Sequence, residues 1–146
     1  METLCEISIN YQYKNKLSEL PKVVTSRDAE TQFRAIWSDR LQYIEEMYLM
    51  LLNRANRVLG YSKISLGGTS GTIVDTKVVF QTALKSNASS IILCHNHPSG
   101  NLKPSEADQK ITKSLKEAGK IMDIVLIDHL IITDEGYFSF ADEGML

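Results

Sequence analysis

The sequence predicts a single α/β domain in which helices flank a mixed β-sheet. Three stretches carry this prediction: the apolar runs Met47–Leu52 and Ile91–Cys94, and an amphipathic segment that begins near Ser105. Neither apolar run alternates with polar residues, which is typical of strands buried on both faces of a sheet. A length of 146 residues, with 43% apolar and 23% charged residues, suits one domain with a core of its own.

The first forty residues are expected to form an extension, one strand and one helix, that packs on a main domain of residues 41–146. Residues 4–13 alternate imperfectly between apolar and polar side chains and predict the strand. Thr25 or Ser26 then caps a helix of about 12 residues. Its apolar side comprises Phe33, Ile36 and Trp37. The extension carries no recognisable chemistry, so we expect it to cover a sheet face or to meet a partner.

The main domain is expected to begin with a hairpin, in which the strand Met47–Leu52 turns at 53–56 into a second arm at 57–64. The glycine-rich segment Gly67–Thr72 lacks the Gly-Lys-Ser/Thr ending of a phosphate-binding loop. We expect it to be a flexible loop that lines the functional site. Residues 75–86 predict a helix. Its expected inward residues are Val78, Val79, Ala83 and Leu84.

The last third of the chain predicts a helix, a strand and a short hairpin. The helix runs from Ser105 to Ala118 and is ended by Gly119 in the left-handed conformation. Residues 121–133 are strand-like, with a break at Asp128-His129, and a turn at 134–136 leads into a return strand at 137–140. The apolar stripe of the helix comprises Ile111, Leu115 and Ala118.

The composition excludes several classes of protein. A net charge of −2 argues against a strongly electropositive surface, so we expect no direct binding of DNA. Cys5 and Cys94 are too few and too far apart for a disulfide framework. The sequence has no apolar run of 18 residues and no secretory signal, and we therefore expect a cytoplasmic protein without a membrane partner.

Two histidines follow the buried strand Ile91–Cys94, with one residue between them. His95 and His97 would present two imidazoles at the end of a strand, and this arrangement is suited to a borderline metal such as Zn²⁺. The residues after them, Pro98 to Gly100, predict a turn. The end of this strand is therefore the first candidate for a metal site.

Ser105 and Asp108 have two interpretations. The pattern Ser-x-x-Asp is a capping box at the start of a helix. Asp108, however, lies three residues before Ile111 and projects on or beside the inward stripe of the predicted helix. A carboxylate that faces inward is costly unless it is paired or binds a metal, so Asp108 is a third candidate ligand beside the two histidines.

A catalytic zinc site also needs a carboxylate that takes and passes on a proton. Glu45 and Glu46 precede the strand Met47–Leu52, and successive side chains of a strand point to opposite faces. Both faces of this strand are apolar, so the alternation does not choose between the two glutamates.

Three further polar residues are given structural interpretations. His129 is expected to be a hydrogen-bonded histidine on a strand, because three ligands are already placed. Ser99 is interpreted as a turn residue rather than a nucleophile, since no base is placed beside it. Lys103 is interpreted as a solvated lysine of the loop.

Together these residues resemble a known family. His95-x-His97, followed by Ser105 and Asp108, resembles the motif of the JAMM (JAB/MPN) zinc metalloproteases. The wider match resembles the bacterial RadC-like branch of that family and covers roughly residues 40–146. It comprises His95–Gly100, Pro104–Asp108 and Asp128–Leu130.

The resemblance implies a JAB/MPN fold of cytidine-deaminase-like architecture. It also implies a zinc-dependent hydrolase of amide or isopeptide bonds that acts on a peptide or protein substrate. Ser105 would orient the attacking water and stabilise the oxyanion. RadC-like chains place their glutamate eight positions before the Asp or Asn that ends the strand, here Asn53, which selects Glu45 as the base. The implied zinc ligands are His95, His97 and Asp108.

The alternative function is that of a binding module, an accessory protein of DNA repair, recombination or mobile elements. Longer RadC proteins carry a helix-hairpin-helix domain, which we expect to be absent here. A zinc nucleobase deaminase would need His-x-Glu and Pro-Cys-x-x-Cys, and neither occurs. An inactive scaffold would typically have lost ligands that this chain keeps. A second copy of the chain, in a homodimer, is a further candidate partner.

Overall fold

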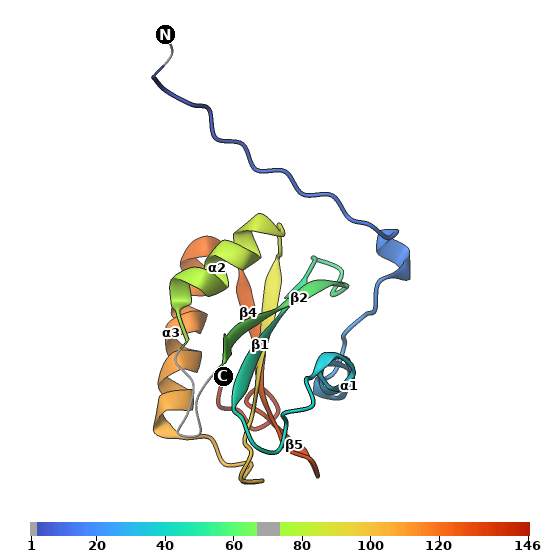
Figure 1. Cartoon of the computed structure of the whole chain (residues 1–146), viewed down its shortest axis with the longest axis vertical. Coiled ribbons are helices and arrows are strands. Elements are labelled where there is room, and N and C mark those ends of the chain that lie inside the picture. Colours follow the sequence, from blue (N-terminus) through green and yellow to red (C-terminus); the bar gives the residue numbers. More distant parts are fainter. Residues whose placement is uncertain (1–2, 67–73) are drawn as a thin grey trace.

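The structure is a computed structural model that describes residues 3–66 and 74–146, and it consists of a five-stranded mixed sheet between two helical layers (Figure 1). The strands are β1 (Glu46–Leu52), β2 (Val58–Leu66), β3 (Ser90–Asn96), β4 (Val125–Ile132) and β5 (Tyr137–Ser139), in the spatial order β2-β1-β3-β4-β5. Helices α2 (Thr76–Lys85) and α3 (Glu106–Met122) cover one face, and α1 (Ser26–Ile36) covers the other. A 3₁₀ turn, η1 (Leu17–Glu19), precedes α1. The predicted fold class is confirmed.

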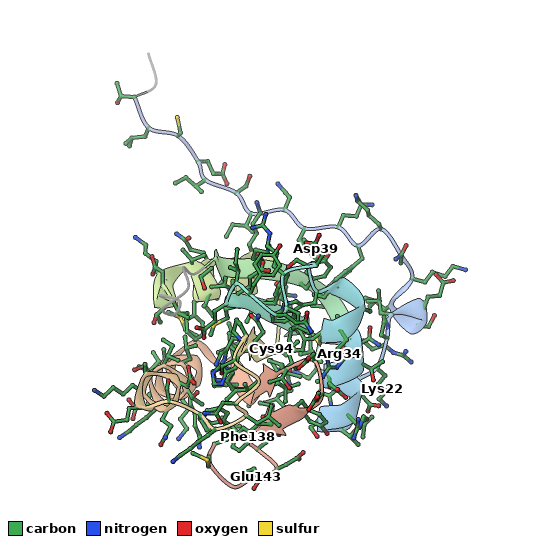
Figure 2. All side chains as sticks on the ribbon, turned by 60° about the horizontal axis from the view of Figure 1, so that its bottom comes forward. Lys22, Arg34, Asp39, Cys94, Phe138 and Glu143 are labelled. Atoms are coloured by element: carbon green, nitrogen blue, oxygen red, sulfur yellow. The ribbon has the colours of Figure 1, made fainter. Side chains whose placement is uncertain are left out.

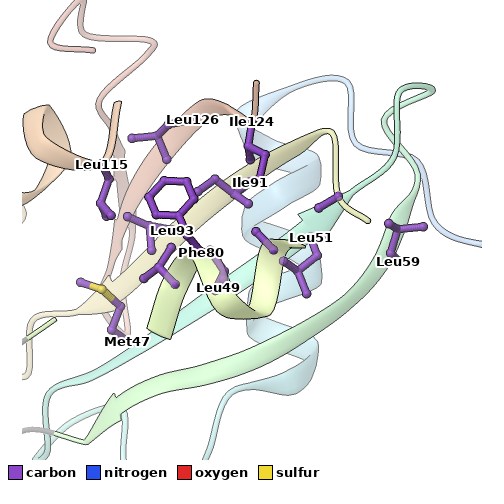
Figure 3. Close-up of a cluster of buried hydrophobic side chains, with 13 residues drawn as sticks. Met47, Leu49, Leu51, Leu59, Phe80, Ile91, Leu93, Leu115, Ile124 and Leu126 are labelled. Atoms are coloured by element: carbon purple, nitrogen blue, oxygen red, sulfur yellow. The ribbon is translucent and has the colours of Figure 1, made fainter. Parts of the chain in front are cut away.

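Side chains alternate between two apolar clusters, one on each face of the sheet. Met47 and Leu49 of β1 and Leu93 of β3 belong to the cluster under α2 and α3 (Figure 3). Tyr48 of β1 and Cys94 of β3 belong to the cluster under α1. Figure 2 shows Cys94 in the middle of the molecule, and burial raises the pKa of its thiol. This alternation fixes the face on which each residue at the strand ends must lie.

The N-terminal strand prediction is wrong. Residues 3–13 have no regular structure (Figure 1), and Tyr13 alone among them packs against the core cluster under α2 and α3. Ile7 and Ile9 are 90% and 73% exposed. An alternating pattern makes a strand only where a neighbouring strand pairs with its backbone, and this segment has none among the described residues.

The predicted helix after Thr25 is confirmed. Thr25 caps α1 through a capping box with Asp28, and Phe33 is fully buried against the sheet. Arg34 lies on the side of α1 that faces the sheet (Figure 2), where it donates hydrogen bonds to the carbonyls of Thr133 (2.9 Å) and Gly136 (3.0 Å). The helix is thereby tied to the β4–β5 turn.

The β1–β2 hairpin is confirmed, and β2 runs to Leu66, two residues further than predicted. The segment Gly67–Thr72, predicted to line the site, lies outside the described residues. In α2 the inward residues are Val79, Phe80 and Ala83, so the expectation for Val78 and Leu84 is wrong. Those two are 38% and 50% exposed because each lies one position beyond the buried stripe of the helix.

Helix α3 does not end at Gly119 but continues to Met122, and Asp123 adopts the left-handed conformation with φ of 56°. Residues 121–122, predicted as strand, therefore belong to the helix. Strand β4 then continues through Asp128 and His129, so the predicted break there is wrong, although a bulge lies directly before Asp128. No helix in the described part of the chain is long and apolar enough to cross a membrane.

Gly119 is required by packing rather than by backbone conformation. A Cβ atom at this position would lie 2.2 Å from the carbonyl oxygen of Ile124. Gly119→Ala is therefore expected to destabilise the protein by about 1–3 kcal/mol, as overpacking does. The same change in an open helix interior would stabilise it by roughly 0.5–1 kcal/mol. Urea unfolding measures the difference, and Ser114→Ala, on the exposed side of α3, is the control. A Gly119→Ala protein as stable as the wild type would contradict the close approach.

Candidate metal centre

Four ionisable side chains from three parts of the chain meet at one end of the sheet. β1 and β3 are antiparallel, with Met47 opposite His95, so the start of β1 lies beside the end of β3. Glu45 precedes β1, and Asp108 lies in the first turn of α3, which follows β3 after a loop. The four are Glu45, His95, His97 and Asp108, whose ligating atoms all lie within 4.8 Å of one another.

The distances within this cluster are short. His95 Nε2 lies 2.9 Å from His97 Nε2 and 3.2 Å from Asp108 Oδ1. The second carboxylate oxygen of Asp108 lies 3.3 Å from His97 Nε2. Glu45 is further out, with Oε1 3.9 Å from His95 Nε2. The first three residues therefore form a compact group, and Glu45 faces it from the side.

Glu45 and Glu46 lie on opposite faces of the sheet. Glu45 shares the face of Met47 and of His95, on which α2 and α3 pack. Glu46 is fully buried on the α1 face, where it accepts a hydrogen bond from Ser38 and forms an ion pair with Lys63. Only Glu45 therefore faces the histidines.

A chain of hydrogen bonds behind His95 assigns its tautomer. The Thr112 hydroxyl donates to the carbonyl of Asp108 (2.6 Å), so it accepts from Nδ1–H of His129 (2.6 Å). Burial holds the pKa of His129 well below its ordinary value, so its ring is neutral. His129 Nε2 then accepts from Nδ1–H of His95 (2.7 Å). The lone pair of His95 Nε2 is left to face the cluster.

A bulge in β4 places His129 in this position. Leu126 packs in the cluster under α2 and α3, and in a regular strand the residue three positions later would lie on the other face. The register of β3 with β4 shifts by one residue between Ile91 and Ile92, which pair with Leu126 and Asp128. The additional residue returns His129 to the face of His95.

The turn after β3 orients the ring of His97 through a hydrogen bond to its Nδ1. Gly100 donates to the His97 carbonyl (3.0 Å) and has a φ of 83°, which strongly favours glycine. The turn brings the carbonyl of Asn101 within 2.6 Å of His97 Nδ1, which donates to it. Ser99 accepts from the amide of Asn101, in keeping with its interpretation as a turn residue. His97 Nε2 therefore also faces the cluster with a lone pair.

This donor set fits a metal ion. Two imidazole lone pairs at 2.9 Å and an adjacent carboxylate repel one another unless a cation, a proton or a metal, lies between them. Tetrahedral zinc, with bonds of about 2.0–2.1 Å, holds its ligand atoms about 3.3 Å apart, close to the observed spacing. Each histidine donates its other N–H to a fixed acceptor, as metal-binding histidines do.

The pKa values of the two carboxyl groups in the cluster are shifted in opposite directions. Burial alone would raise the pKa of Asp108, but hydrogen bonds with His95 and His97 hold it well below its ordinary range. Burial raises the pKa of Glu45, although the two histidines partly offset this. Asp108 is thus ionised over the whole working range of pH, whereas Glu45 is a stronger base than a solvated glutamate.

Metal affinity is expected to fall as the pH is lowered. Burial opposes the protonation of His97, but the contacts with Asp108 and Asn101 outweigh it, and its pKa is raised above the ordinary value. A metal must displace that proton, so affinity is full above this pKa and declines as the pH falls through it. Calorimetry in buffers of different ionisation enthalpy should show proton release on zinc binding near neutral pH. Equal affinity at pH 5 and pH 8 would contradict the arrangement.

The support behind His95 has a measurable consequence. His129→Phe removes the acceptor of His95 Nδ1 while keeping an aromatic ring beside Phe140, on which His129 stacks. Zinc affinity is expected to fall by about 10–100-fold, the usual cost of losing such a partner. Competition with a chelator measures it, and Phe138→Leu, which alters the aromatic packing of Phe140 and leaves His129 in place, is the control. Unchanged zinc affinity in His129→Phe would contradict the assigned chain of hydrogen bonds.

Ser105 lies at the rim of the cluster rather than within it. It caps α3, since its hydroxyl oxygen accepts from the amide of Asp108 (3.0 Å), and Asp108 reciprocates (2.8 Å). Asp108 therefore forms the predicted capping box and also lies beside the two histidines, while its role as a ligand stays a prediction. A hollow of about 450 Å³ adjoins the site, and its walls include Glu45, His97, Lys103 and Ser105.

The sequence interpretation missed two residues that support the site. Thr112 is four positions after Asp108, on the same side of the helix, so helical spacing could have identified it. Asn96, between the two histidines, is fully buried although it is polar, and a polar residue at the end of a buried strand could have signalled this. His129 is a buried, hydrogen-bonded histidine on a strand, behind the cluster and outside it.

Comparison with known proteins identifies the family of the chain. The family model of the RadC-like JAB domain matches residues 24–145, and so includes α1, which the resemblance over residues 40–146 left out. Similar proteins include chains named "UPF0758 protein" from Flavobacterium johnsoniae (45% identical over 134 residues), Porphyromonas gingivalis (41% over 132) and Clostridium perfringens (38% over 144). The alignments cover 92%, 88% and 98% of this chain but 58%, 57% and 61% of the relatives. The chain thus spans less than two thirds of the length of these curated relatives.

Proposed function

Because the chain belongs to the family of RadC-like JAB domains, we propose that it is a zinc-dependent hydrolase of amide or isopeptide bonds in peptide or protein substrates. The observation that carries the proposal is the carboxylate of Glu45 facing the group of His95, His97 and Asp108. Three such ligands leave one position of a tetrahedral metal open, which is typical of catalytic rather than structural zinc sites.

The donor set favours zinc among the common metals. Two imidazole nitrogens and one carboxylate oxygen are ligands that zinc prefers, whereas Mg²⁺ and Ca²⁺ take oxygen ligands almost alone. The two histidines and Asp108 would hold the ion. Bound there, zinc supplies a Lewis acid that brings the pKa of water to about 7.

In this proposal Glu45 moves the proton. Its carboxylate faces the group of ligands from the side, where it would be within reach of a water bound to the ion. It would take the proton of the attacking water at Oε1, the oxygen nearest His95. It would then give the proton to the amide nitrogen as the C–N bond breaks, so that the leaving group departs as a neutral amine. Asp108, with its lowered pKa, stays ionised throughout.

Ser105 would stabilise the oxyanion. Its hydroxyl oxygen already accepts from the amide of Asp108, and its hydroxyl hydrogen has no acceptor in the described part of the chain. That hydrogen can be donated to a substrate oxygen that becomes negative at the helix N-terminus, where unpaired backbone N–H groups add to the effect. The adjoining hollow is where the rest of the substrate would lie.

A screen of a whole proteome tests the proposal and needs no chosen substrate. A bacterial proteome, with its existing amino groups blocked, is incubated with zinc-loaded wild type or Glu45→Gln protein. Peptide cleavage frees new α-amines and isopeptide cleavage frees lysine ε-amines, so labelling and mass spectrometry distinguish the two reactions. Amines that appear only with the wild type would support the proposal. Identical amines in both samples would overturn it and favour the binding module.

A further inference from the structure

We propose that Asn96, which separates the two histidines, is a positioning residue that holds Glu45 toward the metal site. This inference rests on the proposed function, because it concerns the base of that reaction. Asn96 lies on the other face of the sheet from His95, because successive side chains of β3 alternate and Asn96 shares the α1 face with Cys94. Its side chain is nevertheless fully buried.

All three hydrogen bonds of the Asn96 side-chain amide are made with one segment of backbone. Its two N–H groups donate to the carbonyls of Leu41 (2.7 Å) and Ile44 (2.8 Å). Its oxygen accepts from the backbone N–H of Glu46 (2.7 Å). The segment 41–46, the last stretch before β1, is therefore held by one side chain at three points.

These contacts enclose Glu45. The Ile44 carbonyl belongs to the peptide group before Glu45, and the Glu46 N–H belongs to the peptide group after it. Fixing both peptide groups fixes the direction in which the Glu45 side chain leaves the backbone. The segment itself is a series of turns, in which the amides of Tyr43 and Ile44 both bond to the carbonyl of Arg40 (3.1 Å), so no strand pairing holds Glu45.

The arrangement links the proton acceptor to the ligands. His95, Asn96 and His97 are consecutive. The two histidines face the cluster, and Asn96 between them forms hydrogen bonds with the segment that carries Glu45. A shift of about 1 Å in a reacting group can cost roughly 10²-fold in rate. A residue that serves only to satisfy buried backbone would affect stability but not the placement of Glu45.

Cobalt titrated into the metal-free chain is the probe, since its visible absorption reports charged groups near the ion. Glu45→Gln is expected to change the spectrum of bound Co²⁺. Asn96→Ser is expected to shift it in the same direction while still binding one equivalent. Asn96→Ser should also speed hydrogen exchange of the Glu46 amide by about tenfold or more, because that amide loses its acceptor.

Asn53→Ser is the matched control. Asn53 anchors the turn at the other end of β1, where its side chain accepts from the amides of Ala55 (3.0 Å) and Arg57 (2.9 Å). Its loss should lower stability while leaving the cobalt spectrum and the Glu46 amide unchanged. Should Asn96→Ser fail to fold, Asn96→Gln is the second variant, because it keeps both donors and the acceptor but displaces them by one methylene group, and the same spectral and exchange shifts are expected of it.

Turnover supplies a double-mutant test. On a substrate found by amine labelling, Asn96→Ser is expected to lower kcat by about 10–100-fold in the wild-type background and to have little effect in Glu45→Gln. Equal losses in both backgrounds, or a wild-type cobalt spectrum and wild-type exchange in Asn96→Ser, would overturn the positioning role. The spectrum and the exchange need no turnover, so they decide this role even if no substrate is cleaved, a result that would count against the proposed function alone.

Discussion

Replacing His97 by alanine is expected to abolish stoichiometric zinc binding. The change removes one of three ligands and leaves the carboxylate of Asp108 facing His95 alone. The loss should exceed the 10–100-fold that even an outer partner of a ligand contributes. Elemental analysis after exhaustive dialysis measures it, beside the wild type at one zinc per chain.

Ser99→Ala is the control for this experiment. Ser99 lies in the turn after His97 and accepts only from the amide of Asn101 (3.3 Å), so its loss should leave zinc at the wild-type level. Circular dichroism of both variants establishes that each is folded. A folded His97→Ala protein that retains a full equivalent of zinc would show that the ligand assignment is wrong.

Glu45→Gln is expected to keep the fold and the zinc and to lose turnover by about 10²-fold or more, the usual size of a general-base contribution. The amide has nearly the shape of the carboxylate but cannot take a proton. The metal should stay because Glu45 Oε1 is 3.9 Å from the nearest histidine nitrogen, outside the compact group of ligands. Zinc content and turnover of labelled substrates are the two measurements.

Glu46→Gln is the matched variant, since Glu46 is the neighbouring glutamate on the opposite face. It should turn over close to the wild-type rate, although the protein becomes less stable through the weakened contacts with Ser38 and Lys63. Lys63 is 40% exposed, so water can solvate its charge when the partner is lost. If Glu46→Gln loses turnover and Glu45→Gln does not, with zinc present in both, the base is Glu46.

The choice between these glutamates shows what the sequence alone could not provide. Alternation along β1 places Glu45 on the face of Met47, but both faces of that strand are apolar. The missing fact was the pairing of Met47 with His95, which joins residues 48 positions apart in the chain. Only the family resemblance could choose between them, and the residues alone could not.

Predictions from local patterns succeeded where local forces decide the outcome. The caps at Thr25 and Ser105, the β1–β2 hairpin and the buried strand β3 depend on neighbouring residues, and they lie where the sequence indicated. The errors came from tertiary contacts. Close approach of Ile124 to Gly119 explains a glycine inside a helix, and the lack of a pairing strand leaves residues 3–13 irregular.

The order of the site residues along the chain has a consequence for how the protein folds. The compact group comes from one stretch, His95 to Asp108, and closing so short a loop costs little chain entropy. Glu45 reaches it only through the pairing of β1 with β3, which joins residues 48 positions apart and therefore closes a much longer loop. Under the proposed function, the group of His95, His97 and Asp108 can therefore form within one short stretch of chain, whereas the base joins it only through the sheet. A substitution that weakens the pairing of β1 with β3 would then separate the base from the ligands while leaving the ligands together.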